Sequence, residues 1–174
     1  NLLVQSLRVC WAALVAISVV APASAADWPQ FLGPERSGIA AESEPAITRS
    51  FTSAGPEILW QKALGTGFAG PVVSGGKVIV CHRVEDEVII EALDALSGKE
   101  LWKTGYKTNY RDSFGFDNGP RACPTVADDK VFIHGADGIV TALDAKSGKS
   151  LWSYDTVKEL DSQQGFFGRV GAPL

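Results

Sequence analysis

The chain has 174 residues, a formal net charge of −4 and a pI of about 5.2. Its Lys and Arg residues form no cluster, which argues against nucleic acid as a partner because such a surface needs concentrated positive charge. Three cysteines occur without a CxxC pair, so the sequence gives no support for a zinc site or a haem attachment site.

Residues 1–25 have the pattern of a secretory signal peptide. Arg8 is their only charged residue, residues 9–20 are almost wholly apolar, and Ala23-Ser24-Ala25 fits the small-x-small cleavage rule. A retained membrane anchor is the alternative, but serine and proline interrupt the second half of the apolar run. We predict cleavage between Ala25 and Ala26. The protein would then be exported to the periplasm or the cell exterior, and would meet a membrane only through export or peripheral association.

Residues 26–56 are predicted to form an extended N-terminal segment followed by a connector. Pro29 and Pro34 exclude a helix near the start, because proline lacks a backbone donor and constrains the residue before it. We expect Trp28 and Phe31 to anchor this segment on the body of the protein. The rest of the connector is polar and shows no periodicity, which is typical of an irregular surface run.

Residues 57–64 read as a strand that contains Trp60, although nothing before them supplies the rest of a sheet. We interpret them as a ring-closing strand. Such a strand would complete the last sheet of a closed ring and hide its open edge. The strand begins the part of the chain, residues 57–174, that we assign to a repeated β domain.

An internal repeat dominates this domain. Residues 89–102 and 139–152 are identical at ten of fourteen positions, at an offset of fifty residues. A repeat with a period near fifty indicates a propeller or a solenoid. Each copy reads as an apolar strand, a short Asp-Ala-x-Ser-Gly-Lys turn and a second strand that carries a tryptophan.

The residue types of the turn have physical reasons. Asp94 and Asp144 can accept backbone N–H groups of the turn, and Gly98 and Gly148 can take a positive φ without a Cβ clash. The two aspartates occupy the same position of two repeats, so they are better explained as turn residues than as a catalytic pair. The strand tryptophans are expected to pack between neighbouring blades; they are Trp60, Trp102 and Trp152.

The repeat extends to two four-stranded blades and the start of a third. Blade one is predicted over 69–105, with strands at 69–73, 77–82, 87–94 and 99–105. Blade two is predicted over 121–155, with strands at 122–126, 130–134, 138–144 and 149–154. Pro71, Pro124 and Pro173 mark the innermost strand of successive blades, so blade three would begin at 168–174.

The pattern A-x-D-x-x-x-G-x-x-x-W, complete in both copies, resembles the repeat of pyrroloquinoline-quinone-type (PQQ-type) β-propellers, including BamB-like proteins. The opening W-P-Q-F-x-G-P is similar to that of secreted PQQ-like propellers of planctomycete-like bacteria. The resemblance implies an all-β propeller of seven or eight blades. About two of these blades are present, which suggests the N-terminal part of a longer protein.

Candidate binding residues lie in the two crossovers between blades, at 106–120 and 156–168. Strand directions place both crossovers on one face, and function usually sits in such loops on a rigid scaffold. Each crossover is rich in phenylalanine and glycine and leads to an arginine, Arg121 or Arg169. These arginines are weak candidates for receiving the carboxylate of a cofactor or a polyanion. The alternative is that each arginine braces a crossover by donating to a backbone carbonyl.

The sequence predicts neither catalytic residues nor a metal site. His82 and His134 have no further ligands at metal-binding spacing. A disulfide between Cys81 and Cys123 in an oxidising compartment is the alternative to two buried thiols, which are the better interpretation.

The resemblance leaves two functions open. The favoured one is a BamB-like, non-catalytic scaffold that binds a protein or a carbohydrate on the crossover face, without a cofactor. The alternative is a PQQ- and calcium-dependent quinoprotein dehydrogenase of alcohols or sugars. Enzymes of that class carry a catalytic aspartate, calcium ligands and often an adjacent Cys-Cys pair, none of which we recognise in this sequence.

Overall fold

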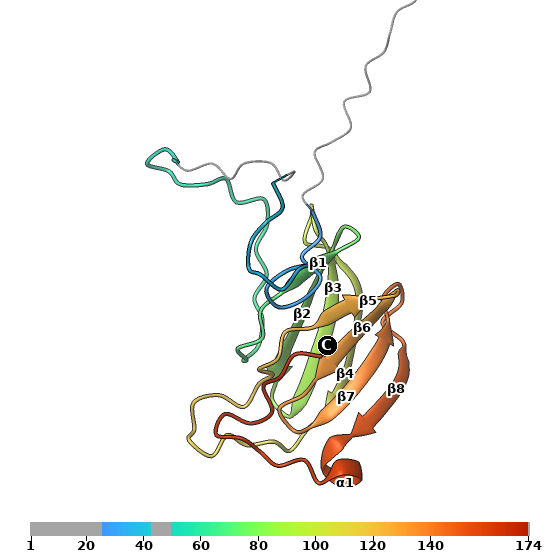
Figure 1. The fold of residues 1–174 in the computed structure, drawn as a ribbon. Coiled ribbons are helices and arrows are strands. Elements are labelled where there is room, and N and C mark those ends of the chain that lie inside the picture. The colour runs from blue at the N-terminus through green and yellow to red at the C-terminus, as the bar shows by residue number, and fades with distance from the viewer. Residues whose placement is uncertain (1–25, 43–49, 174) are drawn as a thin grey trace, which may run out of the picture.

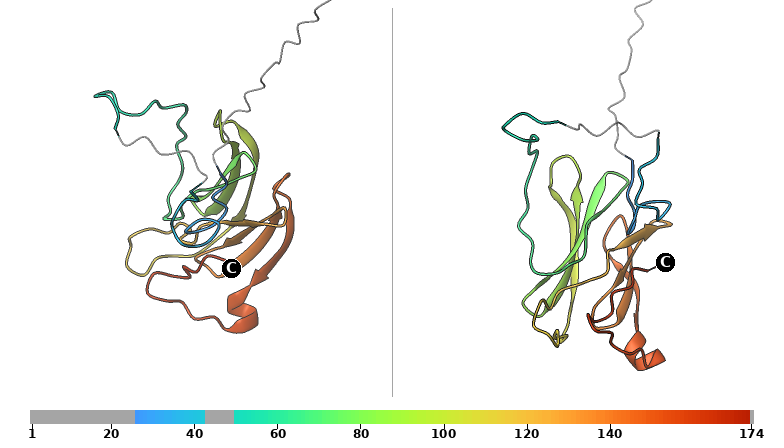
Figure 2. Two further views of the ribbon diagram at one scale, coloured as in Figure 1. Left: turned by 45° about the horizontal axis from the view of Figure 1, so that its top comes forward. Right: turned by 60° about the vertical axis from the view of Figure 1, so that its left-hand side comes forward.

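The structure, a computed structural model, describes residues 26–42 and 50–173, so the predicted signal peptide lies outside the described residues. Within them the chain forms two antiparallel four-stranded sheets packed face to face (Figures 1 and 2). The first sheet contains β1 (Val72–Ser74), β2 (Lys77–Val84), β3 (Glu87–Asp94) and β4 (Glu100–Lys107) in that order. The second contains β5 (Thr125–Ala127), β6 (Lys130–His134), β7 (Ile139–Asp144) and β8 (Ser150–Asp155) in that order. These are the two predicted blades, and most strand bounds fall within three residues of the expected ones.

The two sheets repeat each other in detail. Each has a register shift at the same place, between Ala92 and Leu93 in blade one and between Ala142 and Leu143 in blade two. The β1–β2 turn uses Gly75 and Gly76 at φ 55° and 72°, and the equivalent turn in blade two uses two aspartates at φ 48° and 58°. Glycine and aspartate both tolerate this left-handed geometry, which is that of a tight hairpin turn.

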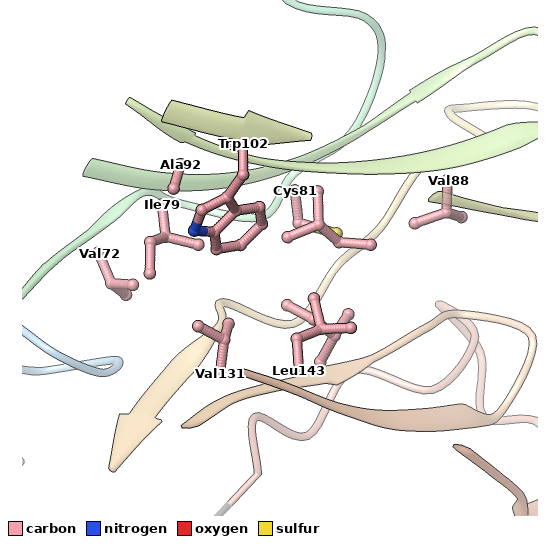
Figure 3. Packing of buried hydrophobic residues seen from close by; sticks show 10 residues of the cluster. Val72, Ile79, Cys81, Val88, Ala92, Trp102, Val131 and Leu143 are labelled. Atoms are coloured by element: carbon pink, nitrogen blue, oxygen red, sulfur yellow. The ribbon is translucent and has the colours of Figure 1, made fainter. Parts of the chain in front are cut away.

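The hydrophobic core lies between the sheets (Figure 3). Alternate residues of β2 and β3, such as Ile79 and Ile90, point from blade one toward Val131, Ile133 and Leu143 of blade two. Most residues of β3 are buried because it lies inside its sheet and is covered on both faces, as its nearly continuous apolar sequence indicated.

The repeat tryptophans pack against the turn of the following blade. Trp102 is 7% exposed and donates its indole N–H to the Ala145 carbonyl at 3.1 Å. A Cβ built on Gly148 would overlap the Trp102 ring. Trp60 makes the same pair of contacts with blade one, donating to the Ala95 carbonyl at 3.0 Å and covering Gly98. Trp152, on the edge strand of blade two, is 46% exposed and has no following sheet beside it in the described residues.

Residues 57–64 form no strand in the described structure, but they are fixed on the face of blade one that points away from blade two. Lys62 forms a 2.6 Å ion pair with Glu91, whose side chain is 3% exposed. Just beyond this stretch, the Gly65 N–H donates to Nδ1 of His82 at 2.9 Å. The predicted ring-closing strand would pair with a sheet that the described residues do not contain, so that role stays a prediction.

The structure departs from a purely β chain in one place. Residues 156–160 were expected to lie in a loop, but α1 (Thr156–Leu160) forms there. The Asp155 side chain accepts the N–H groups of Val157 and Lys158 at 3.1 and 3.2 Å, which caps the helix. The N-terminal segment also differs from the expected extended form, because residues 31–36 make consecutive turns.

No helix in the described residues is long and apolar enough to cross a membrane.

Candidate functional site

The two crossovers lie at the same end of the sheets, together with the β2–β3 turn. Arg83, at the end of β2, is 3% exposed and donates to the carbonyls of Tyr110 and Asn118 at 2.8 and 2.9 Å. The Thr108 N–H donates to the Asp86 carbonyl at 2.9 Å in the turn. Blade one therefore holds the first crossover through buried hydrogen bonds, as a rigid scaffold holds a functional loop.

Asp112 organises the tip of the first crossover. Its side chain is 1% exposed and accepts the N–H groups of Phe114, Phe116 and Asp117 at 3.4, 2.6 and 3.3 Å. Burial opposes ionisation of this carboxyl, but the three N–H groups and the Arg121 charge hold the pKa of Asp112 below the usual aspartate range. The crossover thus takes one defined shape around a buried carboxylate.

Four phenylalanines from the two crossovers form one exposed cluster, which we call the aromatic patch: Phe114, Phe116, Phe166 and Phe167. Phe114 stacks on Phe166 with ring centroids 4.0 Å apart, and Phe166 meets Phe167 edge-on at 4.7 Å. All four are at least half exposed, from 50% for Phe114 to 68% for Phe116. An aromatic cluster of this kind on a monomer surface usually marks an interaction site.

The two candidate arginines bind their own crossovers. Arg121 donates to the Asp117 carbonyl at 2.7 Å, lies 3.6 Å from the Asp112 carboxylate and stacks over the Phe68 ring. Arg169 donates to the hydroxyl of Ser162 at 3.0 Å and to its carbonyl at 2.5 Å. Each guanidinium therefore makes the bracing contacts that were the alternative to a ligand-binding role.

The other predicted site residues are also used internally. Asp94 and Asp144 each accept a serine hydroxyl and backbone N–H groups within their turns, and these hydrogen bonds lower the pKa of both carboxyls. His82 lies 3.2 Å from the buried Glu91, and Nδ1 of His134 donates to the Gly171 carbonyl at 2.9 Å. In residues 26–42 and 50–173, no three His, Cys, Asp or Glu side chains are grouped to hold a metal ion.

Both cysteines of the β domain are free. Cys81 is 3% exposed within the core, where burial and the nearby Asp137 charge raise the pKa of its thiol. Cys123 is only partly buried, so the prediction of two buried thiols is correct for Cys81 and wrong for Cys123. Burial and the raised pKa both disfavour the reactive thiolate form of Cys81.

An open cavity of about 580 Å³ lies between the blades at the crossover end and is lined by residues such as Thr108, Ile139 and Val157. Three carboxylates line it, but each already has a partner. Asp86 pairs with Arg111 at 3.0 Å, Asp155 pairs with Lys158 at 2.9 Å, and Asp137 accepts the Thr108 hydroxyl at 2.6 Å. Each carboxylate of this cavity is therefore held by a neighbouring side chain among the described residues.

Sequence reasoning found the phenylalanines of the crossovers but missed Asp112 and Glu91. The sequence did contain a signal for Asp112. The run from Asp112 to Gly119 is rich in aspartate, asparagine and glycine, which are the residues that favour tight turns. For Glu91, the signal was a charged residue inside the apolar run of β3.

Low pH should loosen the first crossover. Because folding depresses the pKa of Asp112, its stabilising effect is complete above the ordinary aspartate value of about 3.9 and is lost as the pH falls through the lower folded value. Hydrogen exchange at the Phe116 amide should therefore quicken between about pH 4 and pH 2, after correction for intrinsic rates. Asp112→Asn should show weak protection already at pH 7 and little further change on acidification.

Asp161→Asn is the matched control, because Asp161 is exposed and follows α1 in the second crossover. In the Asp161→Asn variant, the Phe116 amide should exchange at the wild-type rate at every pH. Equal protection of that amide in Asp112→Asn and the wild type would show that Asp112 does not organise the loop.

Comparison with known proteins gives one family and a set of related structures. The family model described as outer membrane protein assembly factor BamB matches residues 47–168. A quinohemoprotein alcohol dehydrogenase from Comamonas testosteroni is similar in fold, with a TM-score of 0.53 and 24% identity over 84% of this chain and 21% of that one.

Two further structures match smaller parts of the chain. BamB from Moraxella catarrhalis is 31% identical over 55% of this chain and 26% of its own, with a TM-score of 0.42. A europium-containing methanol dehydrogenase is 28% identical over 53% of this chain and 16% of its own, also with a TM-score of 0.42. The chain thus spans between about a sixth and a quarter of the length of these structures. No curated protein matches the sequence.

Proposed function

Because the chain belongs to the family of the outer membrane protein assembly factor BamB, whose repeat builds PQQ-type propellers, we propose that it is part of an exported, non-catalytic scaffold. In this proposal the signal peptide of residues 1–25 is removed after Ala25, and the mature protein acts in the periplasm or at the cell exterior. Its task is to bind a protein partner on the crossover face.

The aromatic patch is the observation that carries the proposal. Its rings belong to two different crossovers, yet Phe114 and Phe166 stack at 4.0 Å, so the cluster presents one surface. Asp112 and Arg83 fix the loop beneath it through buried hydrogen bonds. A pre-organised aromatic surface loses little conformational entropy on binding, and aromatic residues are enriched at the centres of protein interfaces.

The charges around the patch favour a neutral, apolar partner surface over an anionic ligand. Arg111 pairs with Asp86, while Arg121 and Arg169 donate to carbonyls within the crossovers. Phenylalanine offers no hydroxyl or N–H group to a sugar, whereas tyrosine and tryptophan do. A protein partner also agrees with the name of the matched family, which describes an assembly factor.

The described residues do not fit PQQ and calcium. The two arginines that would receive PQQ carboxylates are engaged within the crossovers: the Arg121 side chain is 4% exposed and donates through Nη2 to the Asp117 carbonyl, and Arg169 donates through Nε and Nη2 to Ser162. Calcium needs six to eight oxygen ligands, and the described part of the chain brings no three acidic, histidine or cysteine side chains together for a metal. We therefore derive no dehydrogenase chemistry from these residues, and the dehydrogenase alternative becomes an outcome of the test below.

Photo-crosslinking in the native cell envelope tests the proposal. A benzoylphenylalanine at position 116, in the aromatic patch, should form a discrete adduct with one protein. The same probe at position 96 should form none, because Leu96 is 80% exposed in the β3–β4 turn at the opposite end of the blade. Phe114→Ser with Phe166→Ser should weaken partner binding at least about 30-fold, equivalent to roughly 2 kcal/mol at an interface hot spot.

Leu96→Ser is the matched control variant and should leave partner binding unchanged. Three outcomes would contradict the proposal. The first is adduct formation that is equal at positions 96 and 116, and the second is binding only to a carbohydrate array. The third is saturable binding of PQQ with Ca²⁺ to the full-length protein together with dye-linked alcohol oxidation, which would favour the dehydrogenase.

A further inference from the structure

The N-terminal segment joins the inner edges of both blades. Trp28 pairs with Val73 of β1 through two backbone hydrogen bonds of 2.8 and 3.0 Å. The next residue, Pro29, accepts the N–H of Val126 in β5 at 2.8 Å. Val73 and Val126 are equivalent residues of the two blades. The segment therefore crosses from one innermost strand to the next at the same height along both strands.

This crossing point lies at the end of the blades opposite the crossovers. The Asp27 carboxylate accepts the Ser74 hydroxyl and the Gly75 N–H of the β1–β2 turn, at distances from 3.0 to 3.1 Å. In Figures 1 and 2 the segment, drawn in blue, runs beside β1 and approaches β5 near the C-terminal residues. It therefore occupies the inner side of the sheets, away from the aromatic patch.

A compact loop follows and is held by its own hydrogen bonds. Arg36 donates to Oε1 of Gln30 through two nitrogens at 2.8 and 3.0 Å, and Gln30 donates to the Pro34 carbonyl at 2.9 Å. Leu32 has φ 63°, a left-handed conformation that is costly for a side chain of this size. Such strain persists only where the surrounding structure holds it.

Phe31 and Leu32, at the tip of this loop, face the space along the innermost strands. Phe31 was expected to anchor the segment on the body of the protein, but it is 58% exposed, and Leu32 is 43% exposed. Both line a cavity of about 460 Å³ with inner residues of blade one and Cys123, and a second of about 160 Å³ with Thr125 and Pro173. The loop tip thus borders the inner edges of blade one, blade two and the predicted start of blade three.

We propose that residues 27–38 form a channel plug. In a closed propeller the innermost strands surround the central channel, and a loop that follows three successive inner edges at one level narrows that end of it. The exposed Phe31 and Leu32 side chains would pack against the inner strands of the remaining blades. Large ligands would then reach the channel only from the crossover face, where the aromatic patch lies.

This inference is independent of the proposed function, because it rests on different residues and has its own readout. A simple edge-protecting strand would need only the backbone pairing of Trp28. It would not need a strained loop that turns two large apolar side chains toward the channel.

Cysteine accessibility in the full-length protein tests the plug. Thr125→Cys, in a Cys123→Ser background, places a thiol under the loop at a position that is 6% exposed. A bulky polyethylene-glycol maleimide should modify it slowly while the loop is intact. Phe31→Ala with Leu32→Gly should raise the rate on the order of tenfold, since access limits thiol modification. Glycine suits the left-handed φ at position 32, so this variant should fold.

Ser113→Cys on the crossover face is the matched reporter and should label equally fast with and without the plug side chains. Arg36→Ala is a second variant that loosens the loop while keeping its apolar residues, and it should raise the Thr125→Cys rate by a smaller factor. Circular dichroism at equal temperature should give the same spectrum for all variants. Rapid labelling of Thr125→Cys with the loop intact, or an unchanged rate in both loop variants, would overturn the plug.

Discussion

Replacing Trp102 with alanine should destabilise the full-length protein by about 3–5 kcal/mol, the usual cost of truncating a large buried aromatic side chain. The indole ring is 7% exposed, belongs to the core cluster between the blades and covers the turn of blade two (Figure 3). Truncation would remove this contact area and would also leave the Ala145 carbonyl without its 3.1 Å hydrogen bond. Urea unfolding of the purified protein, followed by far-ultraviolet circular dichroism, measures the effect.

Lys99→Ala is the control for this experiment, because Lys99 lies in the exposed turn that precedes β4. It should change the free energy of unfolding by less than about 0.5 kcal/mol. Lys103 would be a poor control despite its partial exposure, since its ammonium lies 3.5 Å from the buried Glu91 carboxylate. A small and equal effect in Trp102→Ala and Lys99→Ala would mean that the inter-blade core lies elsewhere.

The blades could be predicted from the sequence because the same hairpin sequence occurs twice, in residues 89–102 and 139–152. A residue type that is the same in both copies, such as the tryptophan at positions 102 and 152, is required by the fold. Positions that differ between the copies are free to vary. The bounds of β3 and β6 agree with the prediction because a charged or glycine-containing turn ends each apolar run. Innermost strands were harder, since β1 and β5 are only three residues long.

The arrangement of the site could not be predicted because it depends on contacts between segments that differ in the two blades. Both crossovers are rich in phenylalanine and glycine, but they cannot be aligned residue by residue, so the sequence did not show that Phe114 and Phe166 stack. Asp112 acts on N–H groups of its own loop, and any of several nearby carboxylates had the same local pattern. Likewise, α1 depends on Asp155 as its N-cap. A single capping residue is a weak sequence signal for a helix when it directly follows residues that favour a strand.

The repeated glycines illustrate how a correct prediction was incomplete. The turn sequence explained Gly98 and Gly148 by their positive φ, and the structure gives them φ 68° and 69°. It also shows a second requirement, because Trp60 and Trp102 lie directly on these glycines where a Cβ would be. The tryptophan and the glycine of the following blade therefore form one interaction, although they lie 38 residues (Trp60 and Gly98) or 46 residues (Trp102 and Gly148) apart in sequence.

Gly148→Ala should consequently destabilise the full-length protein by about 2–4 kcal/mol. Of this, about 1 kcal/mol comes from placing alanine at positive φ, and about 1–3 kcal/mol comes from displacing the Trp102 ring. A double-mutant cycle separates the two contributions. In a Trp102→Ala background the ring is absent, so Gly148→Ala should cost only the conformational part, and the two effects should fall short of additivity by about 1–3 kcal/mol.

The matched control is Gly76→Ala, which has φ 72° but no atom within 4 Å of the added Cβ. It should cost about 1 kcal/mol in both backgrounds, because only the backbone conformation is affected. If Gly148→Ala costs no more than Gly76→Ala, or if its cost is the same with and without Trp102, the glycine is required for the turn alone. If the cycle shows the expected coupling, the blades are held in register by a contact between each tryptophan and the next glycine.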